Sequence, residues 1–525
     1  MPTADRTHPL AAATPAVATP PVPGVPRPDL GPALAVLLDP SLAHVVDLVA
    51  WAQDGQVHVA DAAGHACVPR DDPGRGWTTV RGRNPVADQD PLAGGGIPGR
   101  PETPSTAVAG AGRSYPHAAE RLVDALADPD RAPDLWVVHT ADHHWPEREG
   151  HLGEHGSLNV GQSRAPLLLS GAGVAARGPL PRSARTVDVA PTLLAALGVA
   201  MPGVHGTPLD LVAPGAARVV GLLWDGAHPG ELDALADAGE LPAVQRLREH
   251  GCWLTGGAIA AFPSVTLVNH TSALTGVGPG RHGIVHNVFY DRRSGERVLA
   301  NDSATWHRAC DLLRPGVRTV WEVLAEARPG ALSACVDEPV DRGAGYSTFG
   351  LVRDAGAAGG ASGLTDALPS ADDDPLATAA FVAALPDYRW GSQIDRLGLD
   401  QMLGLFGGAD GTGDPAAAPV LTWWNSTLTD AGHHAGGPGS DVARAALRDT
   451  DRRLGVFLDR LEALGLLADT CILLTADHGS ERADETVRGD WDAALVAAGV
   501  TFRDEGYGAI YLPRAGGDGS GANGS

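Results

Sequence analysis

The sequence predicts an α/β fold in which helices flank a mixed, mostly parallel sheet. Short apolar runs, typical of buried strands, alternate along the chain with amphipathic helical patterns, and parallel strands need such helices as crossover connections. The chain has 525 residues and is 43% hydrophobic and 19% charged, a composition typical of globular proteins. At roughly 150 residues per domain, this length is enough for two or more cores.

The N-terminal block, residues 30–213, contains three strand patterns and one helix pattern. The strand patterns are HVVDLVAW, DLWVVHT and APLLLSG, and the helix pattern is DVAPTLLAALG. Residues 85–115, in the middle of this block, are rich in glycine and proline and predict a loop.

The C-terminal block, residues 214–513, has the same alternation. It opens with the strand pattern RVVGLLWDG and continues with the helix pattern ELPAVQRLREHG, and its later strand patterns are PVLTWWNS and TCILLTADHG. Between those two strands, DTDRRLGVFLDRLEALG has apolar residues near i, i+3, i+4 and i+7, which predicts an amphipathic helix. The segment 350–375 predicts a loop, and we expect residues 290–420 to form a cap insertion that carries substrate selection.

The two ends and the overall charge exclude several classes of protein. Residues 1–29 are rich in proline and alanine, residues 514–525 are rich in glycine, and both predict disorder. A net charge of −24 argues against nucleic acid and anionic membranes as partners. The five cysteines are scattered without a CxxC pair, which argues against a disulfide framework. Because we find no signal peptide and no membrane-spanning run, we expect a cytoplasmic protein.

Aspartate and histidine follow four of the predicted strands. In parallel sheets, ligands bind beyond the carboxyl ends of the strands, so these residues are expected to lie together. One Asp-Gly pair alone is ordinary turn chemistry, but four such strand ends favour a metal site. Mixed aspartate and histidine ligands favour Zn²⁺, with Mn²⁺ as the alternative. The residues are Asp225, Asp430, His433 or His434, Asp477, His478 and His155.

Four motifs resemble those of the type I phosphodiesterase/nucleotide pyrophosphatase group of the alkaline phosphatase superfamily. The run AFPSVTLVNHTSALTGVGPGRHGIVHN at 261–287 resembles the nucleophile segment of that group. RVVGLLWDG, TDAGHHAGGP and LLTADHG resemble its metal-binding segments, and the order of the four motifs matches across 218–480. The resemblance implies an alkaline-phosphatase-like fold. It also implies hydrolysis of phosphodiester or nucleotide pyrophosphate bonds in a small phosphorylated substrate, which would include nucleotides.

The resemblance also implies the roles of individual residues. Thr266 would be the nucleophile and form a phospho-threonine intermediate, and Asn287 would donate to a phosphoryl oxygen. His433 stands where the family has a glycine, which leaves His433 and His434 open as the ligand, although spacing favours His434. Two divalent metal ions would be bound, one by Asp225, Thr266, Asp477 and His478, and the other by Asp430 and His434.

The second of these metal ions needs a further histidine, which the family places near its C-terminus. Residues 479–525 contain no histidine. GHLGEHGSLNVGQSRAPLLLSGAG, in the N-terminal block, resembles the missing segment, and VDVAPTLLAALGVAMPGVHGTPLDL resembles the closing helix of the superfamily. We therefore predict a circularly permuted chain in which His155 completes the site. His143, His144 and His151 are alternatives, and His155 could also enter the site of a partner in a swapped dimer.

Three other functions fit the same motifs. A phosphomonoesterase or a phosphonate hydrolase of the superfamily would use the same nucleophile and metals. We find no lysine in the sequence, which leans towards diesters, because monoesters carry more charge and gain more from cationic side chains. A non-catalytic metal-binding module is the remaining alternative.

Overall fold

A central sheet of eight strands forms the core of the computed structural model, which describes residues 28–92, 114–145, 151–357, 374–408, 411, 413–506 and 508–514. Only β8 runs antiparallel to its neighbours, so the predicted mixed, mostly parallel sheet is confirmed. The strand order is β17 (Tyr346–Ser347), β16 (Ser333–Val336), β18 (Leu421–Ser426), β11 (Arg218–Trp224), β19 (Thr470–Thr475), β8 (Leu167–Gly171), β12 (Gly251–Leu254) and β9 (Gly178–Leu180).

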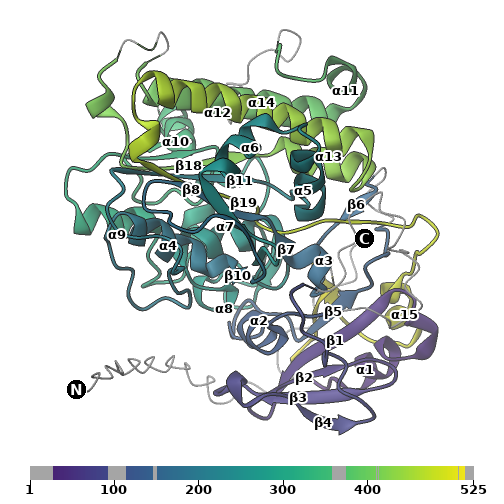
Figure 1. Ribbon diagram of the computed structural model, residues 1–525. Helices are drawn as coiled ribbons and strands as arrows, with labels where there is room; N and C mark the ends of the chain where they lie inside the picture. The colour runs from purple at the N-terminus through teal and green to yellow at the C-terminus, as the bar shows by residue number, and fades with distance from the viewer. Residues whose placement is uncertain are drawn as a thin grey trace, which may run out of the picture.

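Helices cover both faces of this sheet, which explains why its inner strands read as continuous apolar runs. The strands β18 and β19 are buried along their whole length. In Figure 1 one face carries α6 (Pro242–Glu249), α12 (Pro386–Leu405) and α14 (Asp441–Ala463). The other face carries α4 (Val189–Ala196), α7 (Thr266–Thr275) and α9 (Val320–Ala327).

A second sheet contains seven antiparallel strands. The helices α1 (Gly31–Leu37) and α15 (Trp491–Ala497) contribute to the apolar cluster on one side of it, and α2 (Ala118–Ala125) contributes to the cluster on the other. The strand order is β21 (Arg503–Asp504), β22 (Ala509–Tyr511), β5 (Leu135–His139), β1 (Val46–Gln53), β2 (Gln56–Ala60), β3 (His65–Pro69) and β4 (Thr78–Arg81).

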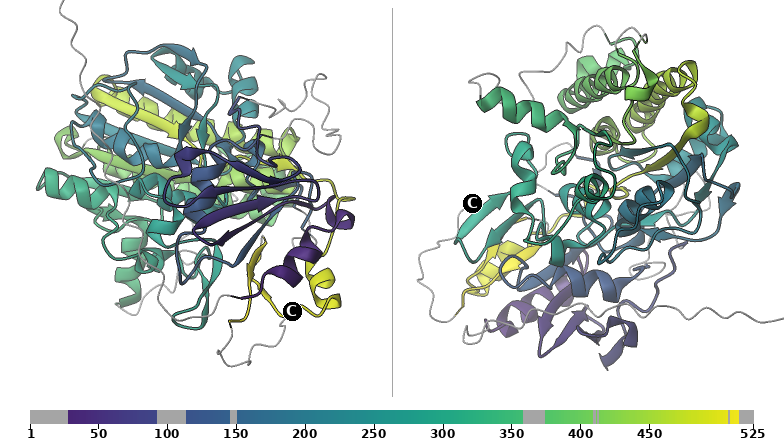
Figure 2. Two further views of the ribbon diagram at one scale, coloured as in Figure 1. Left: turned by 90° about the horizontal axis from the view of Figure 1, so that it is seen from below. Right: turned by 90° about the vertical axis from the view of Figure 1, so that its left-hand side faces the viewer.

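The two sequence blocks are interwoven across both sheets. β8 belongs to the N-terminal block and pairs with β19 in the central sheet. Conversely, β22 belongs to the C-terminal block and pairs with β5, so that Ile510 lies opposite Leu135. Figure 2 shows the first strands of the chain, in purple, in the same sheet as its last strands, in yellow. Each sheet therefore needs strands from both blocks.

The remaining helices are short, and the remaining strands form small sheets of two or three strands. The helices are α3 (Val160–Ser163), α5 (Pro229–Asp237), α8 (Pro279–His282), α10 (Thr348–Ala357), α11 (Ala379–Ala384) and α13 (Leu428–Gly436). The strands are β6 (Gly153–Glu154), β7 (Arg164–Ala165), β10 (Ala184–Arg185), β13 (Ala258–Ile259), β14 (Val288–Asp291), β15 (Glu296–Leu299) and β20 (Glu481–Arg482).

Some predicted loops and ends need comment. The loop prediction for 350–375 is wrong at its start, because α10 continues to Ala357. Within 290–420, β16 and β17 join the edge of the central sheet. The predicted loop at 85–115 has no helix or strand where it is described, and its residues 93–113 lie outside the described chain. The predicted disordered ends also lie outside it, except for residues 28–29 and 514.

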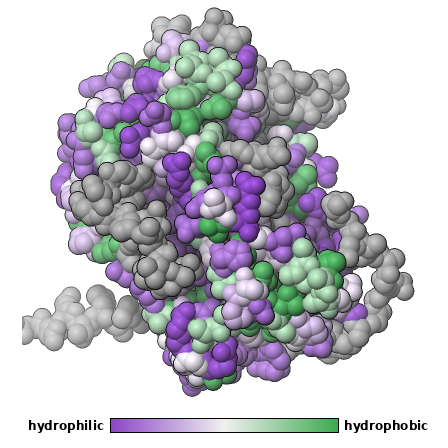
Figure 3. All heavy atoms as spheres, turned by 90° about the vertical axis from the view of Figure 1, so that its right-hand side faces the viewer, coloured by the Kyte–Doolittle hydropathy of each residue, from purple (hydrophilic) through white to green (hydrophobic). Residues whose placement is uncertain are grey.

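The surface is mixed in polarity. Figure 3 shows small hydrophobic groups interspersed with hydrophilic residues on one face. Among the described residues, no helix combines the length and hydropathy needed to cross a bilayer.

Candidate metal centre

Three neighbouring parallel strands bring their carboxyl ends together. Asp225 directly follows β11, Asp477 follows β19 by one residue, and α13 begins just after β18. His478 Nε2 lies 3.0 Å from Asp477 Oδ2 and 3.8 Å from Asp225 Oδ1. The amide of Gly226 donates to Asp477 Oδ1 at 3.0 Å, which directs the other carboxylate oxygen towards His478. The strand-end argument thus brings these carboxylates into one buried cluster.

Gly226 is required at its position for two reasons. Its φ of +61° lies in the left-handed region, which glycine adopts without strain. In addition, a Cβ atom there would lie 2.4 Å from Asp430 Oδ1. A side chain at residue 226 would therefore push Asp430 away from the centre.

α13 separates the two adjacent histidines that the sequence left open. Asp430 and His434 are one helical turn apart, and His434 Nε2 lies 3.2 Å from Asp430 Oδ2. His433 points away, and its Nε2 lies 3.2 Å from Glu231 Oε2. Of the two, His434 is the one that faces the carboxylates.

His155 reaches the same cluster from the N-terminal block of the same chain. It directly follows β6, which pairs with β20 just beyond His478. The His155 ring stacks on the His478 ring with centroids 3.8 Å apart, and its centroid lies 5.1 Å from that of His434. The ligand atoms of His155, Asp430 and His434 all lie within 4.8 Å of one another.

These three histidines share one arrangement. In each, Nδ1 lies within hydrogen-bond distance of a backbone carbonyl oxygen. The distances are 3.0 Å from His155 to Ser264, 2.7 Å from His434 to Gly153 and 2.9 Å from His478 to Gly479. A ring that donates Nδ1–H to a carbonyl presents Nε2 as its ligand atom, which is how histidines that bind metals are usually oriented.

Thr266 is the first residue of α7, and Asn287 lies beside it. The amide of Leu267 donates to Asn287 Oδ1 at 3.1 Å, so the amide NH₂ of Asn287 is the part that can donate to a substrate. His155 contacts Ser264, two residues before Thr266, and this contact ties the start of α7 to the metal centre. The amide of Gly156 and the carbonyl of Ser157 also bond the Ser264 hydroxyl.

The charges of this cluster fit divalent cations. Burial, followed by the charges of Asp477 and Asp430, raises the pKa of Asp225 to about 8. Burial alone would lower the pKa of His478, but Asp477 and Asp225 raise it to about 9. Crowded buried carboxylates of this kind are stabilised by bound cations. Among the described residues, Asp225 Oδ1 and Asp430 Oδ1 are buried and have no hydrogen-bond partner.

The alternative histidines lie in different surroundings. His143 stacks on Trp491 at 5.4 Å and packs edge-on to Trp145 at 4.6 Å, as part of a buried aromatic cluster. His151, in contrast, adjoins the centre: it stacks on His434 at 4.2 Å, and the ligand atoms of His151, Glu154 and His434 all lie within 4.8 Å of one another. The sequence analysis did not name Glu154 as a candidate metal ligand, although its position directly before His155 could have indicated one.

Sequence reasoning also missed His270 and Glu338. His270 lies one helical turn after Thr266 on α7, and its ligand atom groups with those of Asp225 and Asp477. Its i+4 spacing from Thr266 could have indicated a shared helix face. Glu338 lies beyond β16, a strand that the sequence patterns did not reveal.

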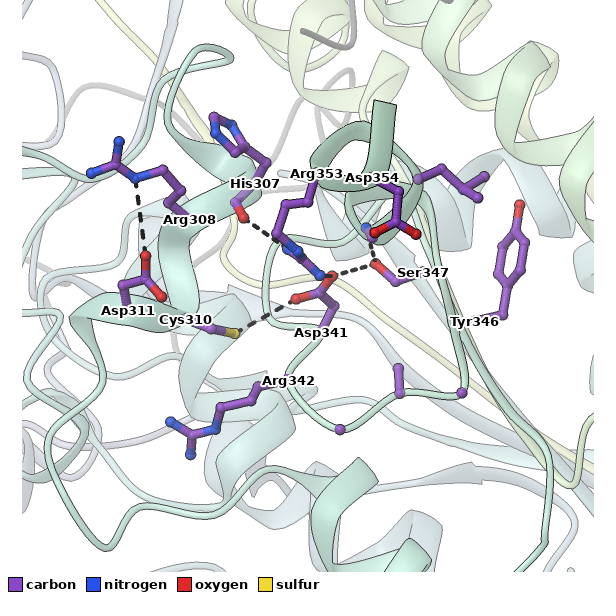
Figure 4. A pocket seen from close by; sticks show the side chains of 15 residues that line it. His307, Arg308, Cys310, Asp311, Asp341, Arg342, Tyr346, Ser347, Arg353 and Asp354 are labelled. Carbon is purple, nitrogen blue, oxygen red and sulfur yellow. Dashed lines mark hydrogen bonds and ion pairs between the residues drawn. The ribbon is translucent and has the colours of Figure 1, made fainter. Parts of the chain in front are cut away.

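A separate open cavity of about 430 Å³ lies between the 3₁₀ segment Trp306–Leu312, β17 and α10. None of the predicted site residues lines it. Figure 4 shows that Arg353, at the centre of this cavity, points to Asp341, at 2.6 Å. The positive charge of the Arg353 guanidinium is therefore already paired with a carboxylate of the protein.

The chain matches one protein family and is similar, over about half of its length, to several solved structures. The family described as type I phosphodiesterase / nucleotide pyrophosphatase matches residues 219–520. Among solved structures, the chain is similar to phosphonoacetate hydrolase from Sinorhizobium meliloti 1021 in complex with phosphonoformate, with 23% identity, a TM-score of 0.33, and coverage of 50% of this chain and 57% of that one.

It is also similar to an inactive form of murine ectonucleotide pyrophosphatase/phosphodiesterase 5 in complex with AMP. The identity is 16% and the TM-score is 0.33, and the match covers 51% of this chain and 59% of that one. The chain thus spans less than two thirds of the length of either structure. The family match, in contrast, extends over more than half of this chain and includes Asp225, Thr266, Asp430 and Asp477. The chain therefore belongs to the type I phosphodiesterase/nucleotide pyrophosphatase family of the alkaline phosphatase superfamily, whose members are hydrolases of phosphoric ester bonds.

Proposed function

We propose that the protein hydrolyses phosphodiester or nucleotide pyrophosphate bonds, with Thr266 as the nucleophile. The observation that carries this proposal is the contact between His155 and Ser264. It joins a buried cluster of aspartates and histidines to the segment that presents Thr266 at the start of α7. A nucleophile beside a candidate two-metal centre is the arrangement that in-line phosphoryl transfer requires.

The residues divide into two metal positions. We assign Asp225, Asp477 and His478, with the Thr266 hydroxyl, to one position, and Asp430, His434 and His155 to the other. When bound, two divalent cations, for which the mixed ligands favour Zn²⁺, would supply Lewis-acid charge and lower the pKa of the Thr266 hydroxyl and of water.

The chain's own groups then bind and orient the substrate. The phosphoryl group would lie at the N-terminus of the ten-residue helix α7, where backbone N–H groups favour an anion. The NH₂ group of Asn287 would donate to a non-bridging oxygen. Thr266 Oγ1 attacks phosphorus, the bond to the leaving oxygen breaks, and the leaving alcohol departs with a proton. Water then cleaves the Thr266–phosphorus bond, which releases a phosphate monoester and restores the hydroxyl.

The residues gathered at this centre suit a diester better than a monoester. They are carboxylates, imidazoles, a hydroxyl and an amide, and we find no lysine in the whole chain. A diester carries one negative charge, so it depends less on additional cationic side chains than a doubly charged monoester does.

The experiment compares turnover of bis-p-nitrophenyl phosphate and p-nitrophenyl phosphate by Zn²⁺-loaded protein. We expect the diester to have the higher kcat/KM. Thr266→Ala should still bind metal through the aspartates and histidines but lose at least about 100-fold in kcat, because the nucleophile is absent. Preference for the monoester would make the protein a phosphomonoesterase. Wild-type protein that binds two metals but turns over neither ester, nor a phosphonate, would contradict a catalytic role.

A further inference from the structure

A buried histidine of the nucleophile segment, to which the sequence analysis gave no role, faces the position between Asp225 and Asp477. The side chain of His270 is only 2% exposed. Its Nε2 lies 3.7 Å from Asp225 Oδ2 and also 3.7 Å from Asp477 Oδ2. At 3.7 Å both contacts are longer than a normal hydrogen bond, so Nε2 lies at ion-pair distance from two carboxylates without being bonded closely to either. A cation shared by the nitrogen and the two carboxylates would account for this spacing.

The other side of the same ring faces a fixed carboxylate. His270 Nδ1 lies 2.9 Å from Glu338 Oε2, and Glu338 is fully buried. Trp423 Nε1 donates to Glu338 Oε2 at 3.1 Å, and the amide of Val340 donates to its Oε1 at 2.9 Å. Histidines that bind metals commonly have a carboxylate behind them, which fixes the ring and increases the basicity of the ligand nitrogen.

The helix α7 explains why His270 lies at this place. Thr266 and His270 are four residues apart, so their side chains leave the helix on the same face. The turn that presents Thr266 at the start of the helix therefore presents His270 to the carboxylates one turn further on. Glu338 comes from beyond β16, two strands from β11 in the central sheet.

We propose that His270, oriented by Glu338, is a ligand of the metal ion that Asp225 and Asp477 bind. The inference rests on the proposed function, because it requires a metal ion at that position. The ligand atoms of the three residues lie within 4.8 Å of one another. A cation about 2.0–2.2 Å from each ligand atom can bridge atoms that are 3.7 Å apart. With His478 and the Thr266 hydroxyl, five protein side chains would then surround this metal position.

The test measures metal affinity rather than turnover. Full-length wild type, His270→Ala and Glu338→Gln are titrated with Zn²⁺ against a chromophoric chelator, and the visible spectra of the Co²⁺ forms are recorded. Glu338→Gln should weaken one of two Zn²⁺ ions by about 10–100-fold, and His270→Ala at least as much. The other Zn²⁺ should keep its affinity. His270→Ala should also change the Co²⁺ spectrum, because one nitrogen ligand is lost.

The matched control is His433→Asn. His433 is also buried and also lies 3.2 Å from a glutamate, Glu231, but it faces away from Asp225 and Asp477. This variant should keep both Zn²⁺ affinities and the Co²⁺ spectrum, although it can lower the melting temperature. Circular dichroism checks folding, and if His270→Ala does not fold, the nearly isosteric Glu338→Gln decides.

Two results would overturn the inference. In one, both variants fold and bind two Zn²⁺ ions with wild-type affinity and unchanged Co²⁺ spectra. In the other, His270→Ala loses a third equivalent of metal while two remain at unchanged affinity, which would place His270 at a separate cation. In either case a wild type that binds two metals and hydrolyses diesters still supports the proposed function. A wild type that binds no Zn²⁺ would contradict the proposed function itself.

Discussion

At the scale of single residues, His155 matters most, because it would bring a metal ligand to the site from the N-terminal block. It lies 109 positions before its contact residue Ser264, and of the other proposed metal ligands only Asp225 also precedes Ser264. The contact through Nδ1 fixes the ring, and the stacking on His478 places it inside the cluster. The metal position of Asp430 and His434 would thus take its third ligand from the other end of the sequence.

His155→Ala should remove one of two bound metal ions and reduce diester hydrolysis by at least about 100-fold, since losing a ligand should exceed the effect of losing an outer partner. Metal analysis after dialysis and kcat/KM for bis-p-nitrophenyl phosphate measure both effects. His65→Ala is a suitable control, because His65 also belongs to the N-terminal block but pairs with His58 at 3.1 Å. Full metal content and activity in folded His155→Ala protein would contradict the composite site.

At the scale of elements, the sequence predicted the inner strands well and the sheet edge poorly. The strands β11, β18 and β19 are buried by helices on both faces, so burial alone imposes a long apolar run. β16 has only four residues, and its end carries Asp337 and Glu338. A strand this short has no readable period, and for this reason Glu338 was missed.

α10 shows the same limit for helices. Its ten residues include two glycines, and glycine disfavours helix. Phe349 is nonetheless buried against Ile394 of α12, with Trp306 and Trp390 packed around them. Packing against a distant segment therefore stabilises this helix, and local patterns in the sequence do not contain that information.

The end of β16 also holds a carboxyl that should destabilise the fold at neutral pH. Asp337 is 3% exposed, and within the described chain neither carboxyl oxygen makes a hydrogen bond of normal geometry. Burial, followed by the charge of Asp395, raises the pKa of Asp337 well above 3.8, and Thr348 offsets only part of this effect. Below pH 3.8 the carboxyl is protonated in both states. Above it, only the unfolded chain releases the proton readily, so stability falls as pH rises towards the folded pKa.

Asp337→Asn should therefore raise the melting temperature at pH 7–8 and have little effect near pH 4. The expected gain at neutral pH is about 1–3 kcal/mol, because asparagine does not have to take up the proton that the buried carboxyl takes up on folding. Asp337 has φ of +54°, which asparagine tolerates well. Asp54→Asn is the matched control, since Asp54 has φ of +49° in an exposed turn and reports the backbone preference alone. An equal gain at pH 4 and pH 8 for Asp337→Asn would refute the titration argument.

At the scale of the whole molecule, the two ends of the described chain meet. Leu30 and Leu512 pack into the same apolar cluster, and α1 contacts α15. In the antiparallel sheet, β5 lies between β22, from the end of the chain, and β1, from its beginning. The resemblance to the family order suggested that these pieces belong together. The pairing itself was not readable from either block, because each block shows only half of the strands that the sheet needs.

The link between the two blocks, in contrast, is a surface segment. Residues 213–215 are exposed, between the end of the N-terminal block and β11. Chain breaks at exposed loops are tolerated when the surrounding contacts remain. These two features, adjacent ends and an exposed link, are the conditions under which the order of the blocks can be exchanged without changing the fold.

A rearranged chain tests this directly: it begins at Gly215, runs to Ser525, and continues from Met1 to Pro214. The original terminal segments then serve as the linker, so no contact between described residues is removed except the peptide bond between Pro214 and Gly215. We expect this protein to bind two metals and to hydrolyse the diester at a rate within the same order of magnitude as the original chain.

Residues 214–525 expressed alone should not fold, because β19 would lose β8 and β22 would lose β5. A rearranged chain that folds but binds only one metal would show that His155 does not complete the site. A folded, active 214–525 fragment would show that the N-terminal block is dispensable.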